Sequence, residues 1–147
     1  MITITINDQK IKVEEGTTLL KAALDHNIYI PHICHHPDLP EISTCKLCLV
    51  DIEGEEKPLC SCKVKVKDGM VVHTESEEVT RLRNLAMELI LAAHPEDCST
   101  CPKYGQCELQ NLIQYMNVSA TRMHRRVKGF KEIKNSPLYI HDMNRCI

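Results

Sequence analysis

Two consecutive sets of four soft metal ligands constrain the fold of this chain of 147 residues more than any other feature. The first set has the spacing C-x10-C-x2-C-x11-C, and the second has H-x3-C-x2-C-x5-C. Thiolates select iron–sulfur clusters, zinc or cuprous copper. A small chain that uses so many residues in this way is most simply interpreted as a carrier of two metal centres. The two sets are Cys34, Cys45, Cys48 and Cys60, and then His94, Cys98, Cys101 and Cys107.

The cysteines indicate metal binding rather than disulfides. There are nine of them, an odd number, and two closely spaced C-x2-C pairs are among them. The N-terminal sequence has neither the basic leader nor the apolar run of a secretory signal. We therefore expect a cytoplasmic protein whose thiols bind metal. No apolar segment approaches the ~20 residues of a membrane helix, so we expect no direct membrane insertion.

The composition predicts a thin hydrophobic core and no catalytic domain. The chain has one Phe, four Tyr and no Trp, although large rings usually supply much of the buried area of a small domain. Such domains often depend on a bound metal for stability. The length excludes a large catalytic core, and we find no catalytic residues. Any oxidoreductase activity is expected from a larger assembly.

Charge is distributed unevenly along the chain. Residues 119–147 carry seven Lys and Arg against two acidic residues, a net charge of +5 that leaves −7 for residues 1–118. A basic tail can bind nucleic acid, but no stacking aromatics are interleaved closely with these charges. We predict a solvated or subunit-facing linker and no nucleic-acid binding.

The first part of the chain predicts a small α+β domain over residues 1–76. Alternating isoleucines in 2–6 and the turn Asn7-Asp8 indicate a hairpin with 10–13. Thr17 or Thr18 can cap a helix that ends near His26, and prolines punctuate a loop over 27–48. Strands are expected over 48–52, 62–66 and 70–73, with turns at Glu53-Gly54 and Asp68-Gly69.

The second part predicts a small helical domain over residues 77–118. Apolar residues fall at helical spacing from Val79 to Ala93, and Thr74-Glu75-Ser76-Glu77 offers a capping box in front of them. The helix should stop at His94, because the residue before a proline disfavours helical geometry. A shorter helix is expected over 108–116, and the second ligand set occupies the loop between the two helices.

For the first ligand set, spacing alone leaves both the metal and the fourth ligand open. Four thiolates suit an iron–sulfur cluster or a structural zinc. Rieske ligation fails because Cys48 stands where a second histidine is needed, and His35 and His36 are expected to be loop residues. In an extended strand, residues 60 and 62 point to the same face. Cys62 therefore competes with Cys60 as the fourth ligand.

For the second ligand set, the alternative is a zinc knuckle with one histidine and three cysteines. A histidine at a helix end is often a cap, but His94 lies just ahead of a cysteine triplet, which favours a ligand. A neutral imidazole in place of a thiolate makes a cluster less negative and raises its potential. That choice of ligand is explained by redox tuning rather than by a structural purpose.

Both ligand sets lie in motifs of a known family. Residues 30–39 (IPHICHHPDL), 45–50 (CKLCLV) and 58–60 (PLC) resemble the [2Fe–2S] domain of complex-I type. Residues 94–101 (HPEDCSTC) and 105–110 (GQCELQ) resemble the one-histidine, three-cysteine [4Fe–4S] motif that follows it. The family includes the large iron–sulfur subunit of respiratory complex I. It also includes electron-input subunits of NAD(P)-linked hydrogenases and formate dehydrogenases, and the N-terminal part of iron-only hydrogenases.

The resemblance covers about residues 1–119 and implies a β-grasp ferredoxin-like fold with one [2Fe–2S] and one [4Fe–4S] cluster. It implies an electron-transfer subunit of a hetero-oligomeric complex. The implied partners are a flavin-containing NAD(P)H-oxidising subunit and an acceptor such as a hydrogenase, a formate dehydrogenase or a ferredoxin-like subunit. By this resemblance Cys60 is the fourth ligand of the first centre. The alternative is a non-redox interaction module stabilised by zinc.

Two departures from the family pattern stand out. Relatives usually have Thr-Pro where this chain has Cys62-Lys63. The family also commonly continues, after a segment like 136–139, into a ferredoxin-like domain that opens C-x2-C-x2-C. We therefore expect either that Cys146 begins such a motif or that it is a free thiol.

Overall fold

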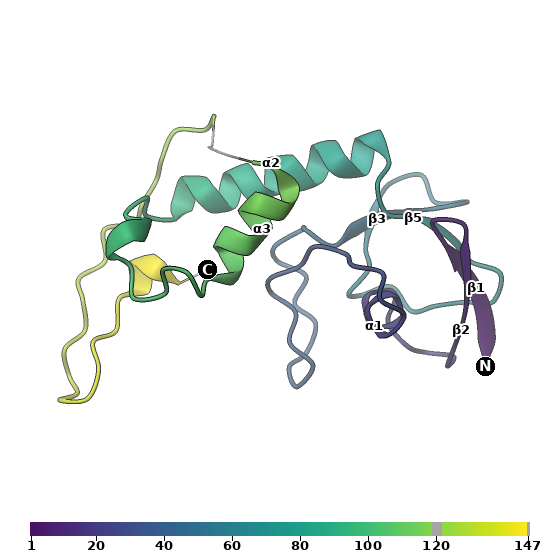
Figure 1. The fold of residues 1–147 in the computed structure, drawn as a ribbon, viewed down its shortest axis with the longest axis horizontal. Helices are drawn as coiled ribbons and strands as arrows, with labels where there is room; N and C mark the ends of the chain where they lie inside the picture. Colours follow the sequence, from purple (N-terminus) through teal and green to yellow (C-terminus); the bar gives the residue numbers. More distant parts are fainter. Residues whose placement is uncertain (119–121, 147) are drawn as a thin grey trace. The chain divides into compact units, whose positions relative to one another are not determined.

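The computed structural model describes residues 1–118 and 122–146 (Figure 1). The chain divides into two compact units, Met1–Ala86 and Met87–Ile147. The helix α2 (Glu77–Ala93) contributes its first turns to the first unit and its last turns to the second. The first ligand set therefore lies in one unit, and the second set lies in the other.

The first unit begins with the predicted hairpin. β1 (Ile2–Ile6) pairs antiparallel with β2 (Gln9–Val13), so that Ile2 lies opposite Val13. The two turn residues, Asn7 and Asp8, have φ values of +47° and +68°. A two-residue hairpin turn of type I′ needs positive φ at both positions, which Asn and Asp tolerate better than other non-glycine residues. The prediction of this hairpin is confirmed.

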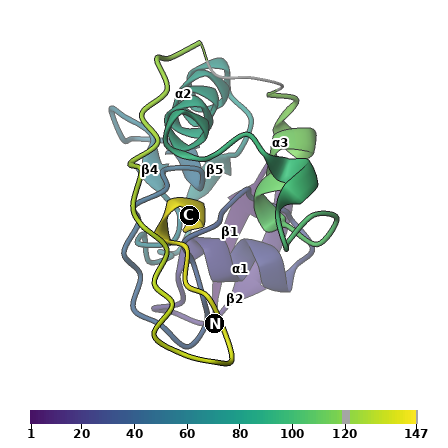
Figure 2. The same cartoon turned by 90° about the vertical axis from the view of Figure 1, so that its left-hand side faces the viewer.

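A mixed five-stranded sheet organises the unit, in the order β2-β1-β5-β3-β4. β3 (Leu49–Ile52) pairs antiparallel with β4 (Leu59–Cys60) and with β5 (Val71–His73), whereas β1 and β5 are parallel. The helix α1 (Leu19–Asp25) packs on this sheet (Figure 2). This arrangement confirms the predicted α+β class and the β-grasp layout.

The predicted strand over 62–66 is wrong. The chain turns immediately after β4, where the amide of Lys63 donates to the carbonyl of Cys60 at 2.9 Å. The next residues pair with the start of α1 instead, since Leu19 N donates to Val64 O at 2.8 Å and Val66 N donates to Thr17 O at 3.0 Å. Cys60 and Cys62 are therefore not on one face of a strand, and the argument that made them equivalent does not hold.

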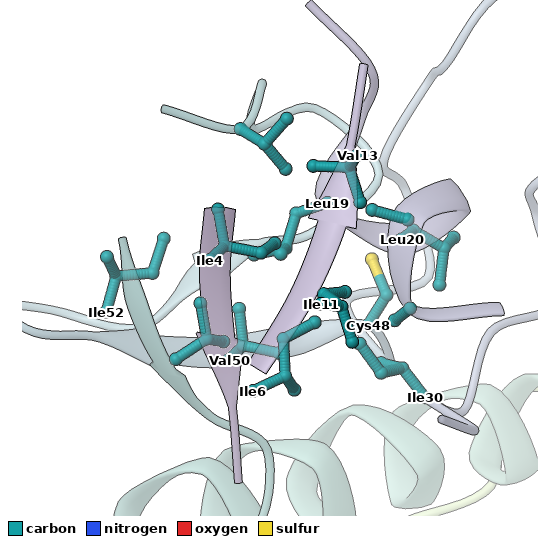
Figure 3. Packing of buried hydrophobic residues seen from close by; sticks show 14 of the residues in the cluster. Ile4, Ile6, Ile11, Val13, Leu19, Leu20, Ile30, Cys48, Val50 and Ile52 are labelled. Atoms are coloured by element: carbon teal, nitrogen blue, oxygen red, sulfur yellow. The ribbon is translucent and has the colours of Figure 1, made fainter. Parts of the chain in front are cut away.

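The core of the first unit is aliphatic. Two isoleucines of β1 and two leucines of α1 meet Val50 and Val72 of the central strands, all with no exposed surface. Cys48 belongs to the same cluster, and Figure 3 shows its sulfur near Ile11, Leu20 and Ile30. The first ligand set thus borders the hydrophobic core directly. The fully buried residues of this cluster include Ile4, Ile6, Leu19, Leu20, Ile30, Val50 and Val72.

The long helix α2 ends where the sequence predicts, at Ala93 before His94-Pro95. Its start differs from the expected capping box, because the cap is Ser76, whose Oγ accepts a hydrogen bond from Val79 N at 3.2 Å. α3 spans Glu108–Met116 as predicted, and Asn117 closes it in the left-handed region with φ of +53°. None of the helices in the described parts of the chain is long and apolar enough to cross a bilayer.

Candidate metal centres

In the first unit, Cys34 and Cys45 form a pair of thiols. Their Sγ atoms are 3.3 Å apart, and all nine cysteines of the described chain are free of disulfides. Lys46 adopts a φ of +56°, which turns the chain inside the C-x2-C loop. Burial raises the pKa of Cys45, while backbone amides of Leu47, Cys34 and Ile33 lower it. Amides directed at a cysteine sulfur are suited to stabilise a cluster ligand.

Cys48 and Cys60 form the second pair. The register of β3 and β4 places Leu49 opposite Cys60, and Ser61 N donates to the carbonyl of Cys48 at 2.9 Å. The hydrogen bond from the Cys60 thiol lowers the pKa of Cys48 well below the usual range for a thiol. The same bond is the largest cause of the raised pKa of Cys60. The geometry therefore favours a thiolate at Cys48 with a second sulfur beside it.

Cys62 is a fifth thiol at this site. It is 1% exposed and lies in the turn after β4, in hydrogen-bond contact with Cys48. Burial raises its pKa first, and the negative charge of Cys48 raises it further. Cys60 is half-buried and has Lys46 Nζ at 3.9 Å from its sulfur. Cys62 thus packs in the core, whereas Cys60 lies at the rim of the site beside a cation.

Histidines near Cys34 take loop roles. His36 Nδ1 accepts a hydrogen bond from Asp38 N at 3.2 Å, and the ring is exposed. His35 packs edge-on against His32, with the ring centroids 5.8 Å apart. Within the described residues, His35 Nδ1 is a buried atom that lacks a hydrogen-bond partner. An unsatisfied polar atom next in sequence to Cys34 is consistent with a site that accommodates a further group.

The donor set fits a two-iron cluster better than a single ion. The four thiols occur as two pairs, and a [2Fe–2S] cluster is held by four cysteines shared between two irons. A tetrahedral zinc would instead draw all its ligands to within about 2.3 Å of one point.

In the second unit, the predicted ligands line one cavity of about 440 Å³. This volume leaves room for a group larger than a single ion, such as a four-iron cluster. Leu91, Leu109 and Ile113 provide an apolar part of its wall. The ligands that line it are His94, Cys98, Cys101 and Cys107.

Short local elements present these cysteines. Cys98 begins a 3₁₀ turn, η1 (Cys98–Thr100), and Cys101 ends it by donating its amide to Cys98 O at 3.0 Å. Cys107 is the N-cap residue of α3. Cys98 and Cys101 therefore lie at the two ends of one tight turn, and Cys107 lies at the start of α3.

His94 leaves the end of α2 and lines the same cavity. Burial lowers the pKa of its imidazole, and the positive charge of Arg145 lowers it further. Both effects favour the neutral ring, which is the form that binds metal. The structure therefore brings His94 to the same cavity as the three cysteines, and their role as ligands stays a prediction.

Sequence reasoning missed the two arginines, Arg125 and Arg145, that also line this cavity. Both belong to the basic segment that the sequence analysis treats as a solvated or subunit-facing linker. The positive net charge of this segment is visible in the sequence. The local sequence pattern does not indicate that Arg125 and Arg145 lie against the loop that carries the second ligand set.

Comparison with known protein families gives two matches along the chain. Residues 1–77 match a 2Fe-2S iron-sulfur cluster binding domain, and residues 83–122 match the NADH-ubiquinone oxidoreductase-G iron-sulfur binding region. The two matched segments contain the first and second ligand sets, respectively.

Curated relatives are similar over the whole chain. The G subunit of NADH-quinone oxidoreductase from Rickettsia bellii is 38% identical over 147 residues, which are 100% of this chain and 22% of the relative. The G 2 subunit of the same enzyme from Rhizobium meliloti is 39% identical over 100% of this chain and 18% of its own length. The mitochondrial NADH-ubiquinone oxidoreductase 78 kDa subunit of Candida albicans is 36% identical over 99% of this chain and 21% of its own length. The chain thus spans about a fifth of these relatives.

A solved structure has the same fold. A chain in the crystal structure of an NAD+-reducing [NiFe]-hydrogenase in the H2-reduced state superimposes with a TM-score of 0.92 at 32% identity. The match covers 99% of this chain and 62% of that chain.

Proposed function

Because this chain belongs to the family of the large iron–sulfur subunit of complex I, we propose that it relays electrons between an NAD(P)H-linked flavoprotein and a redox acceptor. Its two matched regions bind one [2Fe–2S] and one [4Fe–4S] cluster. When bound, these clusters supply one-electron transfer. The chain's own residues hold the clusters, shield them from water and adjust their potentials.

The observation that carries the proposal is the arrangement of the two ligand sets for more than one iron each. In the first unit the thiols occur as the pairs Cys34–Cys45 and Cys48–Cys60. In the second unit the donors surround a cavity of about 440 Å³. Both arrangements are expected of iron–sulfur sites, and neither suits a mononuclear zinc module.

We assign the ligands accordingly. The first cluster is held by Cys34, Cys45, Cys48 and Cys60, and the second by His94, Cys98, Cys101 and Cys107. Since the two sets share no residue, each centre is expected to form without the other. None of the eight residues acts as a catalytic acid, base or nucleophile, so the chemistry of substrates belongs to other subunits or other segments.

The proposed partners follow from the relatives. Homologues are subunits of NADH-quinone oxidoreductase and of an NAD+-reducing hydrogenase, which supports a hetero-oligomeric complex. The donor is a flavin-containing NAD(P)H-oxidising subunit, and the acceptor is a hydrogenase, a formate dehydrogenase or a ferredoxin-like subunit. We place the protein in the cytoplasm, where nine reduced thiols are compatible with the redox environment.

The test is metal and redox analysis of anaerobically purified protein. The proposal expects about six iron per chain, visible absorption that bleaches with dithionite, and two electron paramagnetic resonance (EPR) signals in the reduced state. Cys45→Ser should remove one signal, and Cys101→Ser should remove the other. Cys146→Ser is the matched control, because Cys146 is exposed and outside both ligand sets. Colourless protein with stoichiometric zinc would overturn the proposal.

A further inference from the structure

Arg145 lies against the ligand loop of the second centre. Its guanidinium donates to both carboxylate oxygens of Asp97, at 3.0 and 2.5 Å, and it lines the same cavity as Cys98 and Cys101. Asp97 directly precedes Cys98. One cation of the basic tail therefore binds the residue before a proposed ligand and faces the space that the cluster would fill.

The tail is folded so as to hold Arg145 in this position. Asp142 caps the 3₁₀ turn η2 (Met143–Arg145), and its Oδ2 accepts from Arg145 Nε at 3.1 Å. Asn144 exchanges two hydrogen bonds of 2.8 Å with the backbone of Phe130. Ile133 and His141 form a β-bridge between these points. The side chain of Arg145 is 27% exposed, compared with 83% for Arg122.

A second arginine fixes the tail to the end of α2. Arg125 donates to the carbonyl of His94 at 2.9 Å and forms an ion pair with Glu96. The amide of Arg126 donates to the carbonyl of Ala92 at 2.8 Å. The last carbonyls of a helix lack intrahelical partners and favour cations. The tail therefore stabilises the helix end from which His94 leaves.

Arg145 lines the cavity together with both kinds of proposed donor, the imidazole of His94 and the thiols of Cys98 and Cys101. A cluster gains negative charge on reduction. A cation beside the cluster therefore stabilises the reduced form and raises the potential.

We propose that Arg145, held by Asp97 and Asp142, is a positioning residue that raises the reduction potential of the [4Fe–4S] cluster and closes its cavity to solvent. The inference rests on the proposed function, because it requires a cluster on His94, Cys98, Cys101 and Cys107. It assigns the basic segment a role at the redox centre within its own unit, beyond that of a linker.

The experiment is an EPR-monitored redox titration of the intact chain with Arg145→Met, Arg145→Lys and the control Lys131→Met. Lys131 is an exposed cation of the same tail that does not line the cavity. We expect a lower midpoint for the four-iron signal in Arg145→Met and a smaller decrease in Arg145→Lys. The two-iron signal of each variant and both signals of Lys131→Met should stay at their wild-type midpoints.

A second readout measures the closure of the cavity. The four-iron absorption should bleach faster in air, or with an iron chelator, in Arg145→Met than in wild type or Lys131→Met. Equal midpoints and equal bleaching rates in Arg145→Met and wild type would overturn the inference. Failure of both Arg145 variants to retain a cluster would also overturn it, because the role would then be structural. If wild-type protein lacks a four-iron signal, the proposed function itself fails.

Discussion

Cys60 lies opposite Leu49 in the β3–β4 pair, one residue along from Cys48, and the two thiols are near enough for each to shift the pKa of the other. This contact joins a cysteine of the core to a cysteine at the rim of the site. Cys62 also approaches Cys48, but from the turn beyond β4. The pairing of these two short strands supports the proposal that Cys60, rather than Cys62, completes the first centre.

The first prediction separates Cys60 from Cys62. Cys60→Ser or Cys48→Ser should abolish the two-iron EPR signal and leave the four-iron signal intact, whereas Cys62→Ser should retain both. The physical reason is that the register of β3 and β4 places Cys60 next to Cys48, whereas Cys62 lies in the turn beyond β4. If Cys62→Ser loses the two-iron cluster and Cys60→Ser keeps it, the assignment of the fourth ligand must be exchanged.

The second prediction concerns His94. His94→Cys should retain a four-iron cluster, because thiolate is the usual ligand, and the added negative charge should lower its midpoint by on the order of 100 mV. A redox titration of variant and wild type side by side measures the shift. His124→Cys, a change to the same residue type outside the cavity lining, is the control. An unchanged midpoint in His94→Cys would mean that His94 is not a ligand.

The third prediction concerns removal of the clusters. Metal binding contributes directly to folding free energy, and the loop from His94 to Cys107 has only one short 3₁₀ turn of its own. Amide hydrogen exchange in this loop should accelerate on the order of tenfold or more in apoprotein. The hairpin of β1 and β2, which belongs to the aliphatic core, should change least. Equal protection of the loop with and without clusters would contradict the prediction.

The fourth prediction concerns Arg83, which is 6% exposed within the first unit. Its guanidinium donates to the carbonyl of Leu49 at 3.1 and 2.5 Å, at the start of β3. Arg83→Met should lower the free energy of unfolding by about 2 kcal/mol, because it removes charge-assisted bonds to a partly buried carbonyl. Chemical denaturation measures the loss. Arg81→Met, which removes an exposed pair with Glu78, should have a clearly smaller effect.

Local patterns in the sequence predict much of this fold. Period-two isoleucines and the Asn7-Asp8 turn specify the first hairpin, and the proline after His94 specifies the end of α2. The ligand sets are also visible, because their members are close in sequence or separated by recognisable turns. The prediction of a strand over 62–66 was wrong, although valines at 64 and 66 are common in strands. In the structure, Val64 and Val66 bond to the start of α1, which propensity along the chain does not indicate.

The contacts of the basic tail could not be predicted for a related reason. Arg145 bonds to Asp97, 48 residues away, and no periodicity links such distant positions. The proximity of Cys48 and Cys60 could not be predicted from the sequence either. Their approach depends on the register of β3 with β4, so spacing alone left Cys62 as an equal candidate.

The two ligand sets differ in how much of the chain must be ordered before they converge. The second set lies within the single loop between α2 and α3, whereas the first requires strands that meet only when the sheet forms. Contacts that are local in sequence form faster than those that close long loops. During synthesis or refolding, we expect the four-iron pocket to become competent for iron before the two-iron pocket. Arg145 can line the four-iron pocket only after the basic tail has packed against the loop that contains Asp97. Time-resolved cluster insertion into refolding protein would detect this order, and simultaneous loading of both centres would exclude it.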